Sequence, residues 1–243
     1  MTDIQPQPDV STVAGAPSET LLDRVRIAIV CGSIIATALL YSTHLTSFYH
    51  LKVFVLALGG AALGFIAIIA RRSPVMRVGI VFWIAMFFFS AIDFIADLRV
   101  FPVRQRPHGD DVFGLMLRFQ LPTFIALSYP LLTREDIRAK VASSIVLAGS
   151  VASVLAIGQY AGVLTFLFPR FPASSPVYSV FGNPGLLGGY IAIALPLALL
   201  GYLRASSMQP LLLAALPAMM SALLLSGART AWLAAAVGCA IVV

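Results

Sequence analysis

Hydrophobic residues in this chain form long runs, separated by short segments that hold nearly all of the charged residues. A helix needs about 20 mostly apolar residues to cross roughly 30 Å of hydrocarbon at about 1.5 Å per residue. Because the runs have about this length, the pattern predicts membrane-spanning helices. The expected spans cover residues 27–43, 53–70, 78–96, 112–132, 141–166, 183–203 and 211–225. A last run, 230–243, reaches only about 21 Å and predicts the beginning of an eighth span.

The runs predict an all-α fold, a polytopic transmembrane helical bundle with seven full spans and a truncated eighth. Residues 1–20 are polar and lack the basic start of a secretory signal, so we expect a disordered cytoplasmic tail. The transmembrane domain then covers residues 21–243. Because the eighth run is too short to cross the membrane, we expect this chain to be the N-terminal piece of a longer protein. A short, tilted terminal helix is the alternative.

The composition agrees with a membrane protein. Hydrophobic residues make up 60% of the chain and charged residues only 11%, against about 25% charged in a soluble domain. Mean hydropathy is +0.96. These values exclude an ordinary soluble domain, a disordered chain and a coiled coil. The net charge of +6 comes from basic residues at the ends of apolar runs. They form no basic face, which excludes nucleic acid as a partner.

The distribution of basic residues between the loops predicts the orientation. With the N-terminus in the cytoplasm, nine basic residues fall on the cytoplasmic side and six on the outer side, with Arg118 inside a span. Cytoplasmic loops carry an excess of Lys and Arg in membrane proteins. The count therefore predicts a multi-pass protein with a cytoplasmic N-terminus. The outer side is still unusually rich in Arg, which suggests that some outer arginines hold an anion.

Ionisable residues inside apolar runs are costly in a membrane and are treated as functional candidates. Arg118 interrupts the fourth expected span, and Asp93 lies near the outer end of the third. Arg118 could bind a ligand or pair with Asp93, whereas a structural pairing is favoured for Asp93. The loop 97–111 holds three Arg and three Asp, and we expect these charges mainly to pair with one another. Cys31 and Cys239 lie in apolar runs and are expected to pack, so no metal site is predicted.

Two segments are more specific. In the first, Gly182-Asn183-Pro184 predicts a turn followed by a helix, with Asn183 as the cap and Pro184 in the first helical position. In the second, Arg229 stands at the start of the last apolar run. The free N–H groups and the dipole of a helix N-terminus attract anions. An arginine at that place predicts an oxyanion or phosphate site.

Together these segments resemble the O-antigen ligase and O-antigen polymerase superfamily of bacterial envelope glycosyltransferases. That family carries a Phe-x-Asn-Pro-Asn-like motif that opens a helix. Two spans later it carries a Ser-Arg-Gly or Ser-Arg-Thr motif, often followed by Ala-Trp. The matching residues are Phe181, Asn183 and Pro184, then Arg229, Thr230, Ala231 and Trp232. Gly185 stands where Asn is common, and Ala228 where Ser is common. The motifs cover about 50 residues of the chain.

The resemblance implies an enzyme of the bacterial inner membrane. Such an enzyme transfers a glycan from undecaprenyl diphosphate to the lipid A core or to a growing polysaccharide at the periplasmic face. It needs no metal and no cofactor, and its proposed histidine base would lie beyond Val243. Arg229 becomes the candidate catalytic residue. Arg170, Arg118 and Asn183 become candidates for binding the lipid diphosphate or the glycan, with a purely structural capping role as the alternative for Asn183.

Two other classes of function remain open. Helix starts that bind anions also occur in transporters and permeases, and bicarbonate-transporter-like relatives belong to the same superfamily. A scaffold protein without an active site is the third possibility. The sequence identifies neither the glycan nor the oligomeric state.

Overall fold

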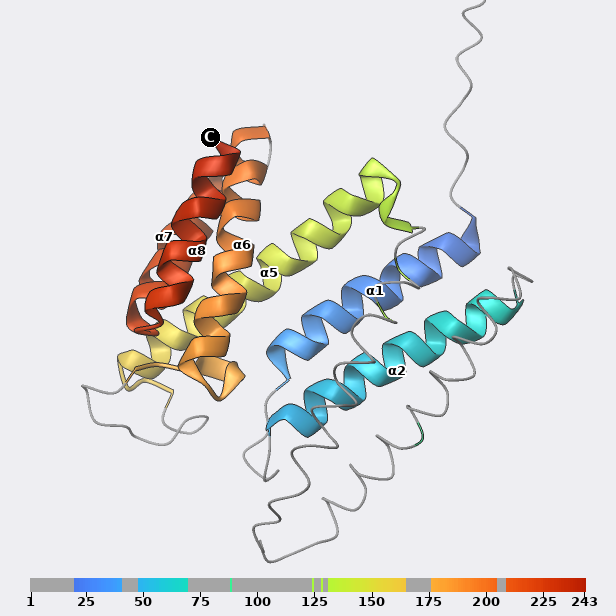
Figure 1. Ribbon diagram of the computed structural model, residues 1–243, viewed down its shortest axis with the longest axis horizontal. Helices are drawn as coiled ribbons and strands as arrows, with labels where there is room; N and C mark the ends of the chain where they lie inside the picture. The colour runs from blue at the N-terminus through green and yellow to red at the C-terminus, as the bar shows by residue number, and fades with distance from the viewer. Residues whose placement is uncertain are drawn as a thin grey trace, which may run out of the picture.

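The computed structural model describes residues 20–40, 48–69, 88, 124, 128, 131–164, 176–204 and 209–243. Over these residues the regular secondary structure is helical, with six α-helices and one 3-10 helix (Figure 1). The elements are α1 (Leu21–Leu39), α2 (Phe48–Ile69), α5 (Glu135–Tyr160), η1 (Ser179–Phe181), α6 (Pro184–Arg204), α7 (Gln209–Leu225) and α8 (Arg229–Val242). The expected tail lies outside the described residues except for Thr20, which precedes α1.

The prediction of seven full spans and a truncated eighth is wrong. Over the described residues, two helices are long and apolar enough to cross a membrane, α5 with 26 residues and α6 with 21. The helix α7 has 17 residues and α8 has 14, which correspond to about 26 Å and 21 Å at helical rise. Both fall short of the roughly 30 Å hydrocarbon core. The expected spans 78–96 and 112–132 lie outside the described residues, apart from isolated positions.

The physical reason for this error is that apolar runs and helices have different boundaries. The helix α1 begins in charged sequence, with Asp23, Arg24 and Arg26 in its first two turns, which shortens its apolar part. Over the described side chains of α2, the apolar helix covers Phe54–Ile66. In contrast, α5 begins six residues before its expected span because Glu135 and Asp136 favour the positive end of a helix dipole.

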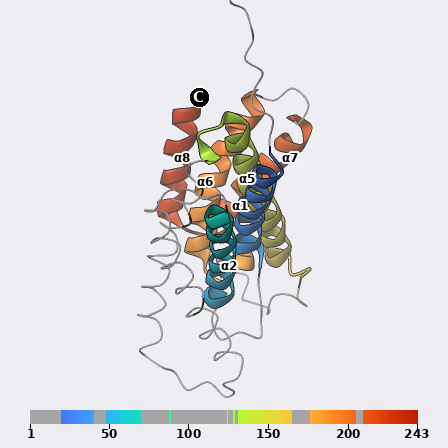
Figure 2. The same cartoon turned by 90° about the vertical axis from the view of Figure 1, so that its right-hand side faces the viewer.

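The helices form an elongated bundle in which neighbours mostly alternate in direction (Figure 1). The helices α1 and α2 are antiparallel, and α1 also packs along α5. On its other side α5 contacts α6 and α7, and α6 contacts α8. The helices α6 and α8 run parallel. The helix α7, which lies between them in the sequence, runs in the opposite direction. Figure 2 shows α7 and α8 apart, with α1 and α2 nearest the viewer.

Small residues set how closely these helices approach. A Cβ added to Gly149 of α5 would lie 2.8 Å from the Cβ of Ala194 in α6. One added to Gly238 of α8 would lie 2.7 Å from Cγ of Pro196 in α6. Real Cβ atoms do not come so close, so the packing of α5 and α8 against α6 requires glycine at both positions.

Candidate functional site

One end of the bundle brings together helix ends that are far apart in the sequence. We call it the motif end, because it holds both segments that carry the family resemblance; it is the lower part of Figure 1. It consists of residues 37–40, 52, 159, 176–188 and 225–232. The helices α1, α5 and α7 end here, whereas α2, α6 and α8 begin here. Three helix C-termini and three helix N-termini therefore meet in one region.

Asn183 caps α6. Its side-chain Oδ1 accepts a hydrogen bond from the Gly185 N–H at 2.7 Å, and its carbonyl accepts one from the Leu187 N–H at 3.1 Å. Gly182, just before it, has φ of 68°, the left-handed conformation that glycine adopts without strain. The predicted turn and cap are therefore confirmed. The exposed Asn183 side chain uses its oxygen to cap the helix, and its amide nitrogen remains available for other contacts.

Arg229 is the first residue of α8, and its side chain is exposed. The residue before it, Ala228, has no side chain that could cap the helix. Its carbonyl accepts hydrogen bonds from the N–H groups of Ala231 and Trp232. The family pattern commonly has Ser in place of Ala228, and a serine would occupy one of the free N–H groups of the first turn. In this chain the free N–H groups of the first turn of α8 remain available to an anion or to water.

The two motif segments contact each other directly. A Cβ added to Gly188 in α6 would lie 2.7 Å from the Cβ of Ala228 and 3.0 Å from the Cβ of Ala231. Gly188 is five residues after Asn183, and Ala228 directly precedes Arg229. The starts of α6 and α8 therefore lie side by side with the same direction. The two motifs are about 50 residues apart in the sequence, and the tertiary structure brings them into contact.

The segment before the first motif is held by hydrogen bonds to α5. Gln159 Oε1 accepts hydrogen bonds from the N–H groups of Tyr178 and Ser179, at 3.1 and 2.8 Å. Ser179 is fully buried, and its hydroxyl donates to the Ala152 carbonyl at 2.8 Å. Ser179 also has φ of 50°, an unfavourable conformation for a residue with a side chain. These hydrogen bonds maintain that conformation and thus the course of the chain into α6.

The turn between α7 and α8 is closed by two side chains that share one acceptor. The Leu223 carbonyl accepts from the Ser226 hydroxyl at 2.7 Å and from the Trp232 indole Nε1 at 2.8 Å. The last four carbonyls of a helix lack partners within it. Trp232 therefore fastens the start of α8 to the end of α7.

Lys52 of α2 was missed as a functional candidate. Its Nζ donates to the carbonyls of Thr37 and Ala38, each at 2.9 Å, and lies 4.6 Å from the centre of the Phe181 ring. Burial lowers the pKa of Lys52 from 10.5 to about 8. The available signal was a single lysine beside an apolar run in a chain with few charges. That pattern does not show which backbone groups the lysine reaches.

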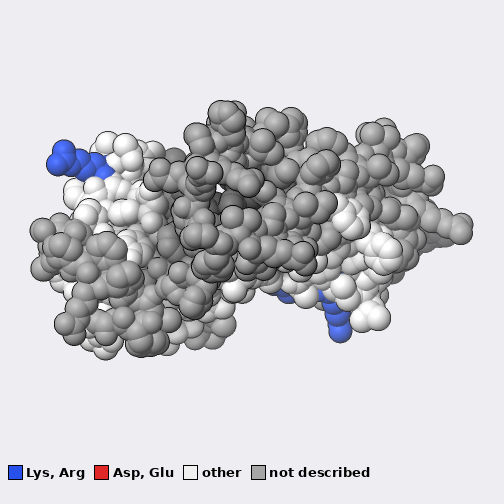
Figure 3. Space-filling view, turned by 90° about the horizontal axis from the view of Figure 1, so that it is seen from below, with Lys and Arg blue, Asp and Glu red and all other residues white. Residues whose placement is uncertain are grey.

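Most of the other candidates lie outside the described residues. This is so for Arg118, Arg170, Asp93 and the loop 97–111. Of the four predicted site residues, the structure therefore places Asn183 and Arg229, both at the motif end. Within the described parts of the chain, no group of three His, Cys, Asp or Glu side chains could hold a metal ion. Seen from below, the described surface shows Lys and Arg atoms but no Asp or Glu atoms (Figure 3).

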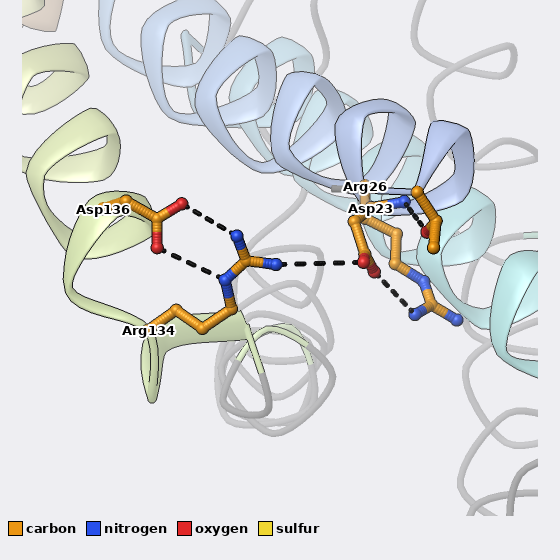
Figure 4. A network of polar contacts seen from close by, with 5 residues as sticks. Asp23, Arg26, Arg134 and Asp136 are labelled. Atoms are coloured by element: carbon orange, nitrogen blue, oxygen red, sulfur yellow. Dashed lines mark hydrogen bonds and ion pairs between the residues drawn. The ribbon is translucent and has the colours of Figure 1, made fainter. Parts of the chain in front are cut away.

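The opposite end of the bundle holds an ion-pair network, and we call it the ion-pair end. Arg134, just before α5, contacts Asp136 at 3.0 Å and Asp23 of α1 at 3.9 Å (Figure 4). Arg26 lies 3.7 Å from the other oxygen of Asp23. This network joins the starts of α1 and α5. It balances charge locally and leaves no single unpaired ion at its centre.

Comparisons with known proteins find no relative of this chain. No protein-family model matches the chain, and neither a curated protein nor a solved structure matches it. The family resemblance therefore depends on the residues of the two motif segments.

Proposed function

We propose that this protein is an integral membrane glycosyltransferase of the O-antigen ligase type. The first support is the exposure of its apolar helices. In the most apolar windows of α5 and α6, only 39% and 44% of the residues are buried. Leu147 and Val154 of α5 and Ile193 of α6 are 52%, 60% and 60% exposed. A core helix of a soluble protein would bury most of this surface, whereas lipid tails solvate it without cost.

The charges at the two ends support an orientation with the N-terminus in the cytoplasm and the motif end in the periplasm. Of the eight described basic residues, six lie at the ion-pair end: Arg24, Arg26, Arg134, Arg138, Lys140 and Arg204. Two lie at the motif end: Lys52 and Arg229. Basic residues are enriched on the cytoplasmic side of membrane proteins. A multi-pass protein of the bacterial inner membrane with this orientation would present both motif segments to the periplasm.

The observation that carries the proposed activity is the contact between the starts of α6 and α8. Both helices begin at the motif end, and the exposed Arg229 stands at the start of α8, where no side chain caps the helix. A diphosphate placed there would meet two positive dipole ends and a guanidinium group that can bind two oxygens at once. This arrangement suits a lipid diphosphate better than a neutral sugar.

The proposed reaction needs charge stabilisation of this kind. The bond between the anomeric carbon of the glycan and a diphosphate oxygen breaks, and the electron pair stays on the departing undecaprenyl diphosphate. A hydroxyl oxygen of the acceptor, lipid A core or growing polysaccharide, forms the new bond and releases its proton to a base. Arg229 stabilises the charge that develops on the diphosphate. Asn183 caps the start of α6, and its amide nitrogen can donate a hydrogen bond to the glycan or the diphosphate. Arg118 and Arg170 remain candidates for further contacts with the donor.

The test is glycan transfer in membranes from cells that express the chromosomal gene or its variants, with a labelled lipid-linked glycan as donor. Arg229→Ala should lower the rate about a hundredfold or more, because one preorganised donor is lost at a developing charge. Arg229→Lys keeps the charge but not the bidentate geometry, so it should retain an intermediate rate. Arg204→Ala, at the other end of α6, is the control and should transfer normally at equal protein level.

Transfer by Arg229→Ala at the wild-type rate would remove Arg229 from the mechanism. The transporter alternative gives a different result, because it predicts no labelled product in any sample. Proteoliposomes that carry the wild-type protein would instead take up labelled bicarbonate, and Arg229→Ala would reduce that flux.

A further inference from the structure

Lys52 joins three elements of the motif end. Its ammonium group has three N–H donors and no acceptor. Two donors are used by the carbonyls of Thr37 and Ala38 in the last turn of α1, both at 2.9 Å. The charge also lies 4.6 Å from the centre of the Phe181 ring, within the range of a cation–π contact. Lys52 itself belongs to α2, so one side chain connects α1, α2 and the segment that leads into α6.

The contacts with α1 have a clear physical basis. The end of a helix carries partial negative charge, and its last carbonyls have no partner within the helix. Leu40, which caps α1, donates its N–H to Ala36 and leaves the carbonyls of Thr37 and Ala38 open. The Lys52 ammonium occupies both. The acidic residues that the structure describes, Asp23, Glu135 and Asp136, lie at the other end of the bundle. Carbonyl dipoles and an aromatic ring therefore take the place of a carboxylate partner.

The contact with Phe181 links this charge to the first motif. Phe181 ends η1 and is 9% exposed, and Gly182 and Asn183 follow it directly. The Phe181 ring also packs against Tyr190, with the ring centres 5.1 Å apart. The Tyr190 hydroxyl donates to the Ile145 carbonyl of α5 at 3.2 Å. The ring is thus located by Lys52 and by Tyr190, and a shift of the ring would move the turn that begins α6.

We propose that Lys52 is a positioning residue, whose ammonium group clamps the Phe181 ring to the last turn of α1 and thereby fixes the start of α6. The Lys52 side chain is half-buried, and a cation–π contact is stronger in a desolvated place than at a fully exposed one. The structural role is independent of the reaction. Its consequence for catalysis, correct placement of Asn183 and the start of α6, depends on the proposed glycosyl transfer.

Hydrogen exchange of the full chain in lipid nanodiscs tests the structural role. In Lys52→Met, the apolar stem remains but the charge is lost, and amides of residues 178–190 should exchange about twofold to thirtyfold faster. Lys52→Arg should restore slow exchange, since its guanidinium can bind both carbonyls and stack on the ring. Arg204→Met removes a basic side chain at the far end of α6 and should leave exchange in 178–190 unchanged. Unchanged exchange in Lys52→Met would refute the proposal, as would equal acceleration in all helices.

The contact with Phe181 can be tested without changing the shape of the ring. Fluorinated phenylalanines at position 181 withdraw electron density stepwise, so protection of residues 178–190 should fall with each fluorine. In Lys52→Met the same series should have no effect. A fluorine series that has the same effect with and without the lysine charge would overturn the cation–π assignment. This test also decides the proposal if Lys52→Met does not insert into membranes. The fluorine series with Lys52 intact must then show the stepwise loss of protection in residues 178–190.

Glycan transfer gives the functional consequence. Lys52→Met should lower transfer by up to about a hundredfold through displacement of the start of α6, and Lys52→Arg should retain it. If the wild type transfers no glycan but the exchange results hold, the proposed function fails and the positioning role stands. If the wild type transfers glycan and Lys52→Met transfers equally well despite faster exchange, its link to catalysis is rejected.

Discussion

The two ends of the bundle use their polar side chains in different ways. At the ion-pair end, Asp23, Arg26, Arg134 and Asp136 pair with one another; Arg26 is buried, whereas the side chains of Arg134 and Asp136 are 31% and 47% exposed. At the motif end, Lys52, Gln159, Ser179 and Trp232 bind backbone groups of other segments. Exposed ion pairs contribute little to stability, whereas a buried backbone group without a partner is costly. The motif end should therefore be the more sensitive of the two.

The comparison also explains how a site with few charges can be rigid. Gln159 and Ser179 are 20 residues apart, and Tyr190 and Ile145 are 45 residues apart in sequence. Such contacts cross-link α5 with the chain on both sides of the first motif. The ion-pair end also has a cross-link, from Arg134 to Asp23, but at 3.9 Å it is a weak one. A preorganised anion site requires hydrogen bonds between distant segments, as at the motif end, because its donors must not move when charge develops.

Loss of the Gln159 amide should have the largest effect on stability. In Gln159→Leu, the N–H groups of Tyr178 and Ser179 lose their acceptor in a partly buried place, and the free energy of unfolding should fall by about 3 kcal/mol. Gln159→Glu keeps an acceptor oxygen and should lose much less. Reversible unfolding in mixed micelles measures both. Equal stability of Gln159→Leu and the wild type would contradict the proposed difference between the ends.

Gly188→Ala should have the next largest effect. The added Cβ would come within 2.7 Å of the Ala228 Cβ, so α6 and α8 must separate, at a cost of about 1–3 kcal/mol. Gly189→Ala is the matched control in the same helical turn, because a Cβ there meets nothing within 4 Å. Alanine favours a helix over glycine, so this control should be neutral or slightly stabilising. Similar losses in both variants would show that α6 and α8 do not pack tightly at Gly188.

A comparable effect should appear in the pH dependence of the motif end. The pKa of Lys52 is lowered from 10.5 to about 8, so between these values the unfolded chain binds more protons than the folded one. The contribution of Lys52 to the free energy of unfolding should therefore rise as the pH increases from 8 to 10.5. Lys52→Arg does not titrate in this range and provides the reference. A difference between the two proteins that stays constant over this range would argue against a buried lysine.

The smallest effect is expected at the ion-pair end. Asp136 is exposed, and its partner Arg134 also contacts Asp23. Asp136→Asn should leave the thermal midpoint unchanged within experimental error, in low and in high salt, because exposed pairs are screened and contribute little. A marked loss of stability in this variant would mean that the network of Figure 4 is as important as the contacts of the motif end.

Several local features follow from the sequence directly. The order of residues Gly182-Asn183-Pro184 predicts a helix start with its cap, and the structure has both. The start of α8 at Arg229 and the end of α7 at Leu225 also follow from the pattern of polar and apolar residues. These features depend on contacts within a few positions, so local chemistry decides them. The number of spans is not local in this sense, and the count of apolar runs predicted it wrongly.

The sequence by itself determined that the chain is helical and apolar, where α6 and α8 begin, and that an asparagine and an arginine stand at those two helix starts. Only the tertiary structure decided that those starts touch, that Gln159 and Lys52 hold the segment that leads into α6, and that Gly188 must be small. The physical reason is that capping and hydrophobic runs act over a few residues. Packing and backbone hydrogen bonds between distant segments depend on which helices become neighbours in space.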